Sequence, residues 1–244
     1  MTTILKLGGS VITDKDRAET VDGDALDRAT AAVAGHEDLV LVHGGGSFGH
    51  HNAQEFGVST TEGTHDVDGV LQIHNAMKAL NGLVMRRLHE RDVPAVPVHP
   101  LSAASRDEGG SLTLPATQVE TLLGEGFVPV LHGDVVAHAG EGATVLSGDE
   151  IVTSLATSLD ADRVGLCSTV PGVLDESDDV ISRIERYDDV ASVLGGADTT
   201  DVSGGMAGKV QTLLELGSPA SIFGLDALSA FLDGERPGTT IESE

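Results

Sequence analysis

Short apolar runs that stop at glycine constrain the fold of this chain more than any other feature. Residues 4–9 read ILKLGG, and residues 38–46 read DLVLVHGGG. Apolar runs this short, bounded by glycine, are typical of strands that are buried in a sheet. Segments with apolar residues three or four positions apart alternate with these runs, which is typical of amphipathic helices. The alternation predicts a mostly parallel sheet that is covered by helices on both faces.

The expected architecture is an α/β three-layer αβα sandwich that forms one domain over residues 1–244. The predicted strands cover residues 4–9, 38–46, 95–100, 127–137, 163–168, 221–225 and 239–242. The predicted helices cover residues 24–36, 70–88, 116–124, 147–159, 206–217 and 226–233. Residues 51–66 are polar and are expected to form an irregular loop, and some of the middle strands are expected to pair as hairpins.

The charge balance restricts the partners of the chain. Lys and Arg number 14 against 39 Asp and Glu, so the formal net charge is −25. Such a surface repels nucleic acid and anionic membranes, and neither is expected as a partner. The charge indicates a protein that stays soluble in a salt-rich cytoplasm, where screening weakens the self-repulsion, although an ordinary acidic protein is the alternative.

The lack of a membrane segment, of a secretory signal and of paired cysteines also favours a cytoplasmic protein. No segment approaches the roughly 20 apolar residues of a membrane-spanning helix. The N-terminus lacks the basic and apolar regions of a secretory signal. Cys167 is the single cysteine, so an internal disulfide is excluded, as expected in a reducing compartment.

The chain has only four lysines, at positions 6, 15, 78 and 209. Lys6, Lys15 and Lys209 lie in glycine-rich or turn-like segments, whereas Lys78 lies beside the apolar stripe of the long predicted helix. An acidic surface that has otherwise lost lysine is expected to keep the few that have a role. We therefore expect the first three lysines to be functional and Lys78 to be solvated.

Several glycine-rich segments follow predicted strands or begin predicted helices, where α/β folds bind ligands. Glycine lets backbone N–H groups approach an anion, and a helix N-terminus adds a favourable dipole. Residues 44–49 match the dinucleotide pattern G-x-G-x-x-G, but the residues after Gly49 do not show the pattern of an apolar-periodic helix. GGMAGK at residues 204–209 fails as a Walker A loop, because Val210 follows the lysine.

Five motifs in order resemble the amino acid kinase superfamily and its fold. They are KLGGS at residues 6–10, HGGGSFGH at 43–50, HGD at 132–134, SGD at 147–149 and GGMAGK at 204–209. Each is weak alone, but together they span nearly the whole chain. Within the superfamily, GGGSFGH and the segment SVITDK at residues 10–15 are similar to the isopentenyl phosphate kinases, which convert isopentenyl phosphate into isopentenyl diphosphate. Fosfomycin kinases share the histidine.

The resemblance implies ATP as phosphate donor, with Mg²⁺ carried on the phosphates and no dedicated metal site in the protein. It places donor-binding residues in both halves of the chain. These are Lys6, Gly8, Gly9, Ser10, Gly46, Thr169, Gly205 and Lys209. It also suggests a homodimer.

The acceptor implied by the resemblance is isopentenyl phosphate, held by Gly45, His50 and Gly148. Lys15 matches the family's lysine that stabilises the transition state, and Asp149 would orient the lysines. The catalytic set is therefore Lys6, Lys15, His50, Asp149 and Lys209. Without the motifs, His50 would be interpreted as a solvent-facing histidine and Asp149 as an ordinary acid at a helix start.

A phosphate acceptor suits this set of residues. A phosphate monoester has a second pKa near 6 and is mostly dianionic at neutral pH, so it needs no general base. It needs cations, because one anion must approach another. Ile73, Met77 and Leu80 belong to the core stripe of the long helix, and one or two of them are expected to border the prenyl tail.

The chain departs from the family pattern at residues 168–173, which read STVPGV where relatives commonly show TDVDGV. Both acids are missing, so the contacts to ribose or base stay open. The alternatives are a kinase acting on another small anion, such as fosfomycin or a carboxylate, and a non-catalytic metabolite sensor. Retention of the lysines and of His50 speaks against the sensor. A nicotinamide-dependent oxidoreductase is disfavoured because the helix pattern after Gly49 is absent.

The net charge predicts that salt stabilises the folded protein. Raising KCl from about 0.1 M to about 1 M shortens the Debye length from about 10 Å to about 3 Å and weakens the repulsion among the acids. We expect the midpoint of thermal unfolding to rise steadily with KCl. Full stability in dilute buffer, measured by circular dichroism, would contradict the salt-rich interpretation.

Overall fold

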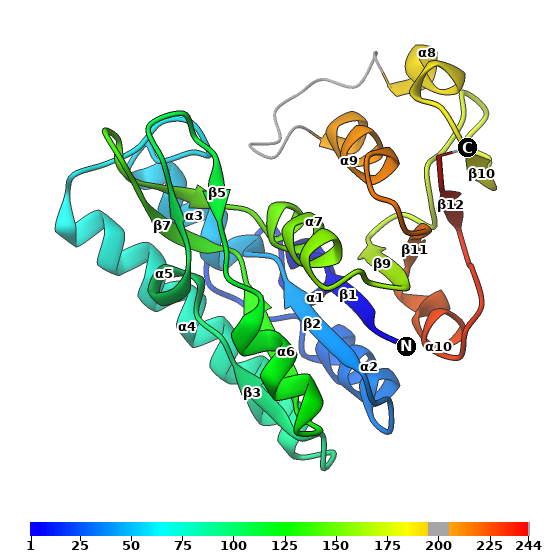
Figure 1. The fold of residues 1–244 in the computed structure, drawn as a ribbon, viewed down its shortest axis with the longest axis horizontal. Helices are drawn as coiled ribbons and strands as arrows, with labels where there is room; N and C mark the ends of the chain where they lie inside the picture. Colours follow the sequence, from blue (N-terminus) through cyan, green and yellow to red (C-terminus); the bar gives the residue numbers. More distant parts are fainter. Residues whose placement is uncertain (195–204, 244) are drawn as a thin grey trace.

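The computed structural model describes residues 1–194 and 205–243, which are built around an eight-stranded sheet (Figure 1). The strands lie in the order β10-β12-β11-β9-β1-β2-β6-β3. Their bounds are β1 Thr3–Leu7, β2 Leu39–His43, β3 Ala95–Pro97, β6 Val128–His132, β9 Arg163–Ser168, β10 Arg183–Ile184, β11 Ala220–Gly224 and β12 Thr239–Ile241. Among these neighbours only β11 and β12 pair antiparallel, so the predicted mostly parallel sheet is confirmed.

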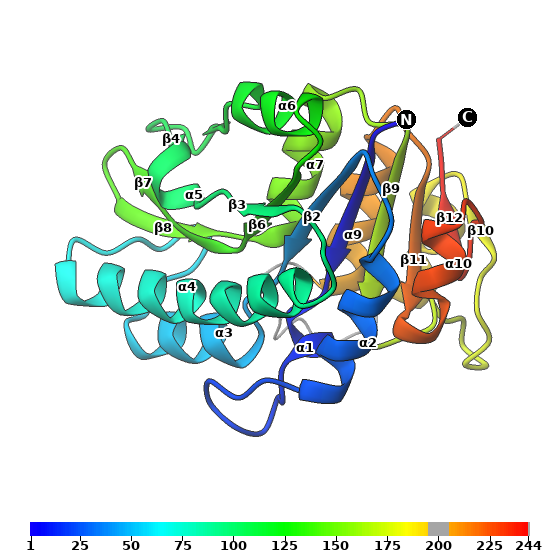
Figure 2. The same ribbon diagram turned by 90° about the horizontal axis from the view of Figure 1, so that it is seen from below.

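Helices cover both faces of this sheet, as the alternating pattern predicted (Figure 2). One face packs against α6, α7 and α9, and the other packs against α2, α4 and α10. The α-helices are α1 Gly9–Ile12, α2 Gly23–Val33, α3 Gly46–Glu55, α4 Val67–His89, α5 Pro100–Ala103, α6 Thr117–Gly124, α7 Gly148–Ser158, α8 Ala191–Leu194, α9 Gly205–Leu214 and α10 Leu228–Leu232. Two 3₁₀ turns cover Tyr187–Asp189 and Leu225–Ala227.

The alternation of side chains along β1 decides what faces each helical layer. Ile4 belongs to the hydrophobic cluster that contains α7, whereas Leu5 and Leu7 belong to the cluster that contains α2 and α4. Successive strand residues point to opposite faces. Lys6 therefore lies on the same face as Ile4 and is directed toward α7, at the carboxyl end of the strand.

A second, four-stranded sheet in the described chain corrects one predicted strand. Residues 127–137 form two strands: β6 ends at His132, and β7 covers Asp134–His138. The second sheet has the order β5-β4-β7-β8, and its other members are β4 Ser105–Arg106, β5 Leu112–Thr113 and β8 Gly142–Leu146. The chain crosses from one sheet to the other at Gly133. The hydrophobic run gave no sign of this break, because both halves are buried. The expected hairpin exists as β7–β8.

The loop predicted at residues 51–66 is partly wrong, because α3 runs from Gly46 to Glu55. The expectation that no helix follows the glycines fails for a physical reason. The helix buries Phe48, Asn52 and Ala53, and Asn52 is polar, so the apolar period is hidden. The Asn52 amide is satisfied by hydrogen bonds, which lets a polar residue occupy a core position.

The long predicted helix is confirmed as α4. The N-cap residue Asp66 precedes it, and Asp66 Oδ1 accepts a hydrogen bond from Asp68 N. Its stripe packs against the sheet, with Ile73, Met77, Leu80, Val84 and Leu88 all buried. None of the helices in the described ranges is both long and apolar enough to cross a membrane.

Two glycine-to-alanine substitutions are expected to act in opposite directions. A Cβ at Gly165 in β9 would lie 2.5 Å from ring atoms of Phe231, so Gly165→Ala should destabilise the protein by about 1–3 kcal/mol. Gly82 lies in α4 with open space around its Cα, so Gly82→Ala should stabilise the protein by about 0.5–1 kcal/mol. Denaturant unfolding measures the free energy of unfolding of both variants. Equal changes in that free energy for Gly165→Ala and Gly82→Ala would contradict the prediction.

Candidate functional site

A cavity of about 730 Å³ opens at the carboxyl ends of β1, β2, β6 and β9. Parallel α/β sheets bind their ligands at this edge. All the predicted site residues except Gly205 line it. They are Lys6, Gly8, Gly9, Ser10, Lys15, Gly45, Gly46, His50, Gly148, Asp149, Thr169 and Lys209. Gly205 begins α9, and the next residue, Met206, reaches the cavity.

Lys6 and Asp149 form a close ion pair in the site. Lys6 Nζ lies 2.6 Å from Asp149 Oδ1, and the two side chains are 10% and 18% exposed. Gly148 makes room for this contact, because a Cβ there would lie 3.2 Å from Lys6 Cε. The partial burial strengthens the attraction relative to a surface pair. Asp149 therefore fixes where the Lys6 ammonium group stands.

Asp149 also lies near a second lysine. Lys209 Nζ of α9 is 3.9 Å from Asp149 Oδ2. One carboxylate thus lies between two ammonium groups that come from opposite ends of the chain. Together the three groups carry a net positive charge, which is the charge that a bound phosphate requires.

The start of α7, which carries Gly148 and Asp149, is held in place by a capping box. Ser147 Oγ accepts a hydrogen bond from Glu150 N at 3.2 Å, and Glu150 Oε2 accepts one from Ser147 N at 3.0 Å. Buried Arg106 donates to Glu150 Oε1 at 2.6 Å. These contacts orient the helix N-terminus, whose dipole and N–H groups favour an anion, toward the cavity.

Two glycine-rich loops pack backbone against backbone at the cavity floor. A Cβ on Gly9 would collide with the backbone N and Cα of Gly46, and one on Gly44 would lie 2.6 Å from Gly9 N. Gly46 also has a φ of 49°, a conformation that favours glycine. The glycines are therefore required by packing as well as by any anion contact. The sequence alone could not separate these two reasons.

Thr13 joins the same two loops and was not singled out from the sequence. Its Oγ1 donates to Gly9 O at 2.8 Å and accepts from Ser47 N at 3.1 Å. It is buried and lies just after α1. Nothing in a single threonine distinguishes such a residue in sequence, because its partners lie in separate segments.

Lys15 and His50 reach the cavity from two other elements. Lys15 lies in the exposed loop after α1, and His50 lies on the exposed side of α3. Neither side chain makes a hydrogen bond or ion pair to another residue within the described ranges. The structure thus brings together all five residues predicted to be catalytic, and their roles stay predictions.

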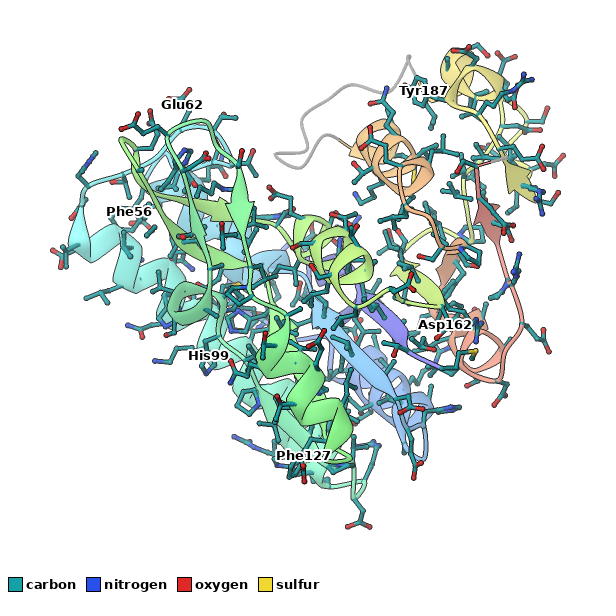
Figure 3. All side chains as sticks on the ribbon, in the orientation of Figure 1. Phe56, Glu62, His99, Phe127, Asp162 and Tyr187 are labelled. Atoms are coloured by element: carbon teal, nitrogen blue, oxygen red, sulfur yellow. The ribbon has the colours of Figure 1, made fainter. Side chains whose placement is uncertain are left out.

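One wall of the cavity is apolar. It includes Ala53, Val58, Ile73, Met77 and Val145, contributed by α3, the segment after it, α4 and β8. Of the three core residues expected to border a tail, Ile73 and Met77 line the cavity and Leu80 does not. Phe56, which is labelled in Figure 3, packs against the apolar residues Ala53, Val58 and Ile73 of this wall. Its ring lies against Gly69, where a Cβ would meet it.

Four histidines form a cluster behind the glycine loops, which the sequence analysis did not expect. His43 and His132 end neighbouring strands, and their rings stack with centroids 5.6 Å apart. His99, labelled in Figure 3, lies 2.9 Å from His132 between Nδ1 and Nε2. His74 Nδ1 lies 2.9 Å from Oδ2 of Asp134, a cavity-lining acid that was not predicted as a site residue.

Burial keeps three of these histidines neutral. It lowers the pKa of His43 and, with nearby His74, the pKa of His99. Burial and the neighbouring His43 lower the pKa of His132 to about 3. Neutral rings suit a hydrogen-bonded support, since His132 Nδ1 donates to Gly133 O at 2.9 Å. We interpret the cluster as the support of the loops that follow β2 and β6.

Comparison with known proteins identifies the relatives of this chain. The family model described as "Amino acid kinase family" matches residues 1–218. An isopentenyl phosphate kinase from Haloferax volcanii is 61% identical over 99% of this chain and 98% of that protein. An isopentenyl phosphate kinase from Methanocaldococcus jannaschii is 32% identical over 99% of both. A crystal structure of isopentenyl phosphate kinase superposes with a TM-score of 0.83 at 30% identity, covering 100% of both chains.

The buried histidines predict a loss of stability in mild acid. In the unfolded chain a histidine binds a proton near pH 6.5, whereas His132 stays neutral down to about pH 3. The unfolded state therefore binds more protons below about pH 6.5, and the free energy of unfolding decreases as pH falls. Between about pH 7.5 and about pH 5.5, His132 alone should cost roughly 1 kcal/mol.

Urea unfolding in constant high KCl measures this loss. The wild type should lose roughly 1 kcal/mol more than His132→Asn over that pH interval. Exposed His51 offers the control, because His51→Asn should keep the wild-type pH dependence. The same loss in all three proteins would contradict the prediction.

Proposed function

The chain belongs to the amino acid kinase family, and we propose that it transfers the γ-phosphate of ATP to isopentenyl phosphate, giving isopentenyl diphosphate and ADP. Besides the similarity to known kinases, one structural observation supports the proposal. A single cavity joins the Lys6–Asp149–Lys209 cluster to the apolar wall of Ile73 and Met77. An acceptor with a phosphate at one end and a short hydrocarbon tail at the other fits both parts.

The donor phosphates are proposed to lie against the β1 and α9 side of the cavity. Gly9, Ser10 and Gly46 begin α1 and α3 and offer backbone N–H groups there, whereas Gly8 N donates to Cys167 O at 2.9 Å and Gly8 is proposed to line the phosphates without donating. Thr169 and Gly205 are proposed to lie toward the nucleotide. Lys6 and Lys209 neutralise the phosphate oxygens on which charge gathers. Thr169 is exposed at the rim, where the missing acids leave the nucleotide preference to be measured.

Mg²⁺ is proposed to arrive bound to the phosphates of ATP. Magnesium commonly combines substrate phosphates with one or two carboxylates. The donor set of this cavity fits an ion held by phosphate better than a protein cage, because Asp149 is engaged by Lys6 and Lys209. When bound, the ion supplies charge neutralisation at the donor phosphates. Within the described ranges, no group of three His, Cys, Asp or Glu residues is placed to hold a metal.

The acceptor phosphate is proposed to lie between α3 and the start of α7, with His50, Gly45 and Gly148 as its contacts. A dianionic phosphate oxygen attacks the γ-phosphorus of ATP, the new P–O bond forms, and the bond to the β,γ-bridging oxygen breaks as ADP leaves. No general base is required. Lys15, on its exposed loop, is proposed to stabilise the charge of the transferring phosphoryl group. Asp149 is proposed to hold the ammonium groups of Lys6 and Lys209 in position.

A homodimer and a salt-rich cytoplasm are proposed as the assembly and the surroundings of the protein. Val67 and Leu71 are exposed on α4, 66% and 48% respectively, and an apolar helix face of this kind suits a homodimer. The charge of −25 suits a salt-rich cytoplasm.

An ADP-release assay in high KCl with Mg-ATP tests the function. The panel holds isopentenyl phosphate, dimethylallyl phosphate, fosfomycin, carbamate, glutamate and N-acetylglutamate. Turnover confined to the two prenyl phosphates supports the proposal. Turnover only with another acceptor keeps the kinase and rejects the substrate. Silence of a folded protein across the panel favours a metabolite sensor.

A pair of substitutions is expected to separate the two substrates. His50→Ala removes a hydrogen-bond donor to the acceptor phosphate and should lower kcat/KM for isopentenyl phosphate roughly tenfold to a hundredfold, with ATP binding nearly unchanged. Lys209→Ala should weaken ATP binding by a similar factor. Steady-state kinetics with each substrate varied in turn measure both effects.

Matched controls exist in His51, which lies beside His50 on α3, and in Lys78, the lysine of α4. His51→Ala and Lys78→Ala change exposed residues that do not line the cavity, and both should leave the kinetics unchanged. Equal losses for both substrates in His50→Ala would overturn the acceptor role, and unchanged ATP affinity in Lys209→Ala would overturn the donor role.

A further inference from the structure

The loop that carries Lys15 is attached to the helix that carries His50. This loop, residues 14–20, is named here the Lys15 loop. Its base is closed by backbone hydrogen bonds from Asp14 N to Thr20 O at 2.9 Å and from Asp22 N to Ile12 O at 3.0 Å. Its tip is exposed from Lys15 to Glu19, so the base alone does not determine where the tip points.

The end of the loop at Glu19 and Thr20 is held by α3, through side chains and through a backbone hydrogen bond from Glu19 N to Ser47 O at 3.4 Å. Glu19 Oε1 accepts a hydrogen bond from Asn52 Nδ2 at 2.9 Å. Ser47 Oγ accepts from Thr20 N and donates to Thr20 O, both at 3.3 Å. Glu19 also has a φ of 47°, a left-handed conformation that is unfavourable for a residue with a Cβ. The loop therefore keeps a disfavoured backbone conformation at the residue that contacts α3.

Asn52 is built to make this contact. It is 1% exposed, and its amide also donates to Phe48 O at 2.7 Å. Its Oδ1 accepts from Gln72 Nε2 of α4 at 3.0 Å. With the oxygen engaged by Gln72, the amide N–H groups point to Phe48 O and to Glu19. A buried amide whose orientation is fixed on three sides makes a rigid anchor for the loop.

We propose that Glu19 and Asn52 are positioning residues whose hydrogen bond holds the Lys15 loop against α3, so that Lys15 and His50 face the same cavity. The inference rests on the proposed function, because it gives these residues a role in that phosphate transfer. Neither residue lines the cavity, so they act through the loop and not by contact with substrate. A lysine that stabilises a transition state must be placed to within a fraction of an ångström, which an exposed loop does not ensure by itself.

The central variant is Glu19→Ala, because Glu19 is exposed and its removal leaves the core unchanged. We expect kcat to fall about tenfold or more while both KM values change less than about twofold, as for a misplaced group that acts in the transition state. Glu19→Gln keeps an acceptor oxygen and should restore most of the activity. Asp16→Ala is the matched control: it removes the same charge from the same loop, and among the described residues the Asp16 side chain makes no hydrogen bond or ion pair to α3.

Two further measurements separate positioning from a general structural effect. In a Lys15→Ala background, Glu19→Ala should lower kcat by less than about twofold, because the group that it positions is gone. Limited trypsin digestion should cut the Arg17–Ala18 bond about fivefold faster in Glu19→Ala than in the wild type, while Asp16→Ala matches the wild type. Digestion is carried out in high KCl for all proteins.

The outcomes are decisive in each case. Wild-type kcat and wild-type digestion in Glu19→Ala overturn the inference, as does a full additional loss in the Lys15→Ala background. If the wild type does not phosphorylate isopentenyl phosphate, the proposed function fails, yet digestion still decides whether Glu19 holds the loop. Faster digestion supports the attachment, and unchanged digestion rejects it.

Discussion

The close approach of two backbones, at Gly9 and Gly46, is the constraint on which the site depends. β1 and β2 are parallel neighbours in register, with Leu7 opposite His43, so the loops that leave them start only about 5 Å apart. Loops this close have no room for a Cβ, and Thr13 closes the contact with two hydrogen bonds. The contact places the starts of α1 and α3 at one edge of the sheet. Every group proposed to bind phosphate is arranged around that edge.

The positive charges of the lysines are concentrated in the cavity, although the molecule as a whole is strongly acidic. The chain carries −25 overall, yet three of its four lysines line one cavity. Lys6, Lys15 and Lys209, the three lysines expected to be functional, line this cavity, whereas Lys78 is exposed outside it; their roles stay predictions. Asp149 makes the arrangement stable, because one carboxylate between Lys6 and Lys209 offsets the repulsion of two ammonium groups and still leaves a net positive charge. A strongly acidic protein can thereby offer a local site for anions.

The segment that joins the two sheets brings apolar residues to the cavity. β6 ends in the main sheet, Gly133 follows, and β7 continues in the second sheet. The second sheet brings Val145 toward Ile73 of α4, which forms the apolar wall. His43, His99 and His132, which burial keeps neutral, lie behind this passage, where charged histidines would be costly to bury. The apolar wall therefore combines Val145 of the second sheet with residues of α3 and α4, whereas the glycine loops follow strands of the main sheet.

The sequence by itself determined most strands of the main sheet, their mostly parallel arrangement and the two helical layers, because apolar periods are local signals. It also singled out most of the glycines and the three lysines that line the cavity, because a special backbone conformation and a depleted residue type are local signals too. Tertiary structure decided the rest. Asp149, which pairs with Lys6, lies 143 positions away from it. Helix α3 buries the polar residue Asn52, and the run at residues 127–137 divides between two sheets. Such facts depend on which surfaces pack together, and packing joins segments whose local patterns carry no information about each other.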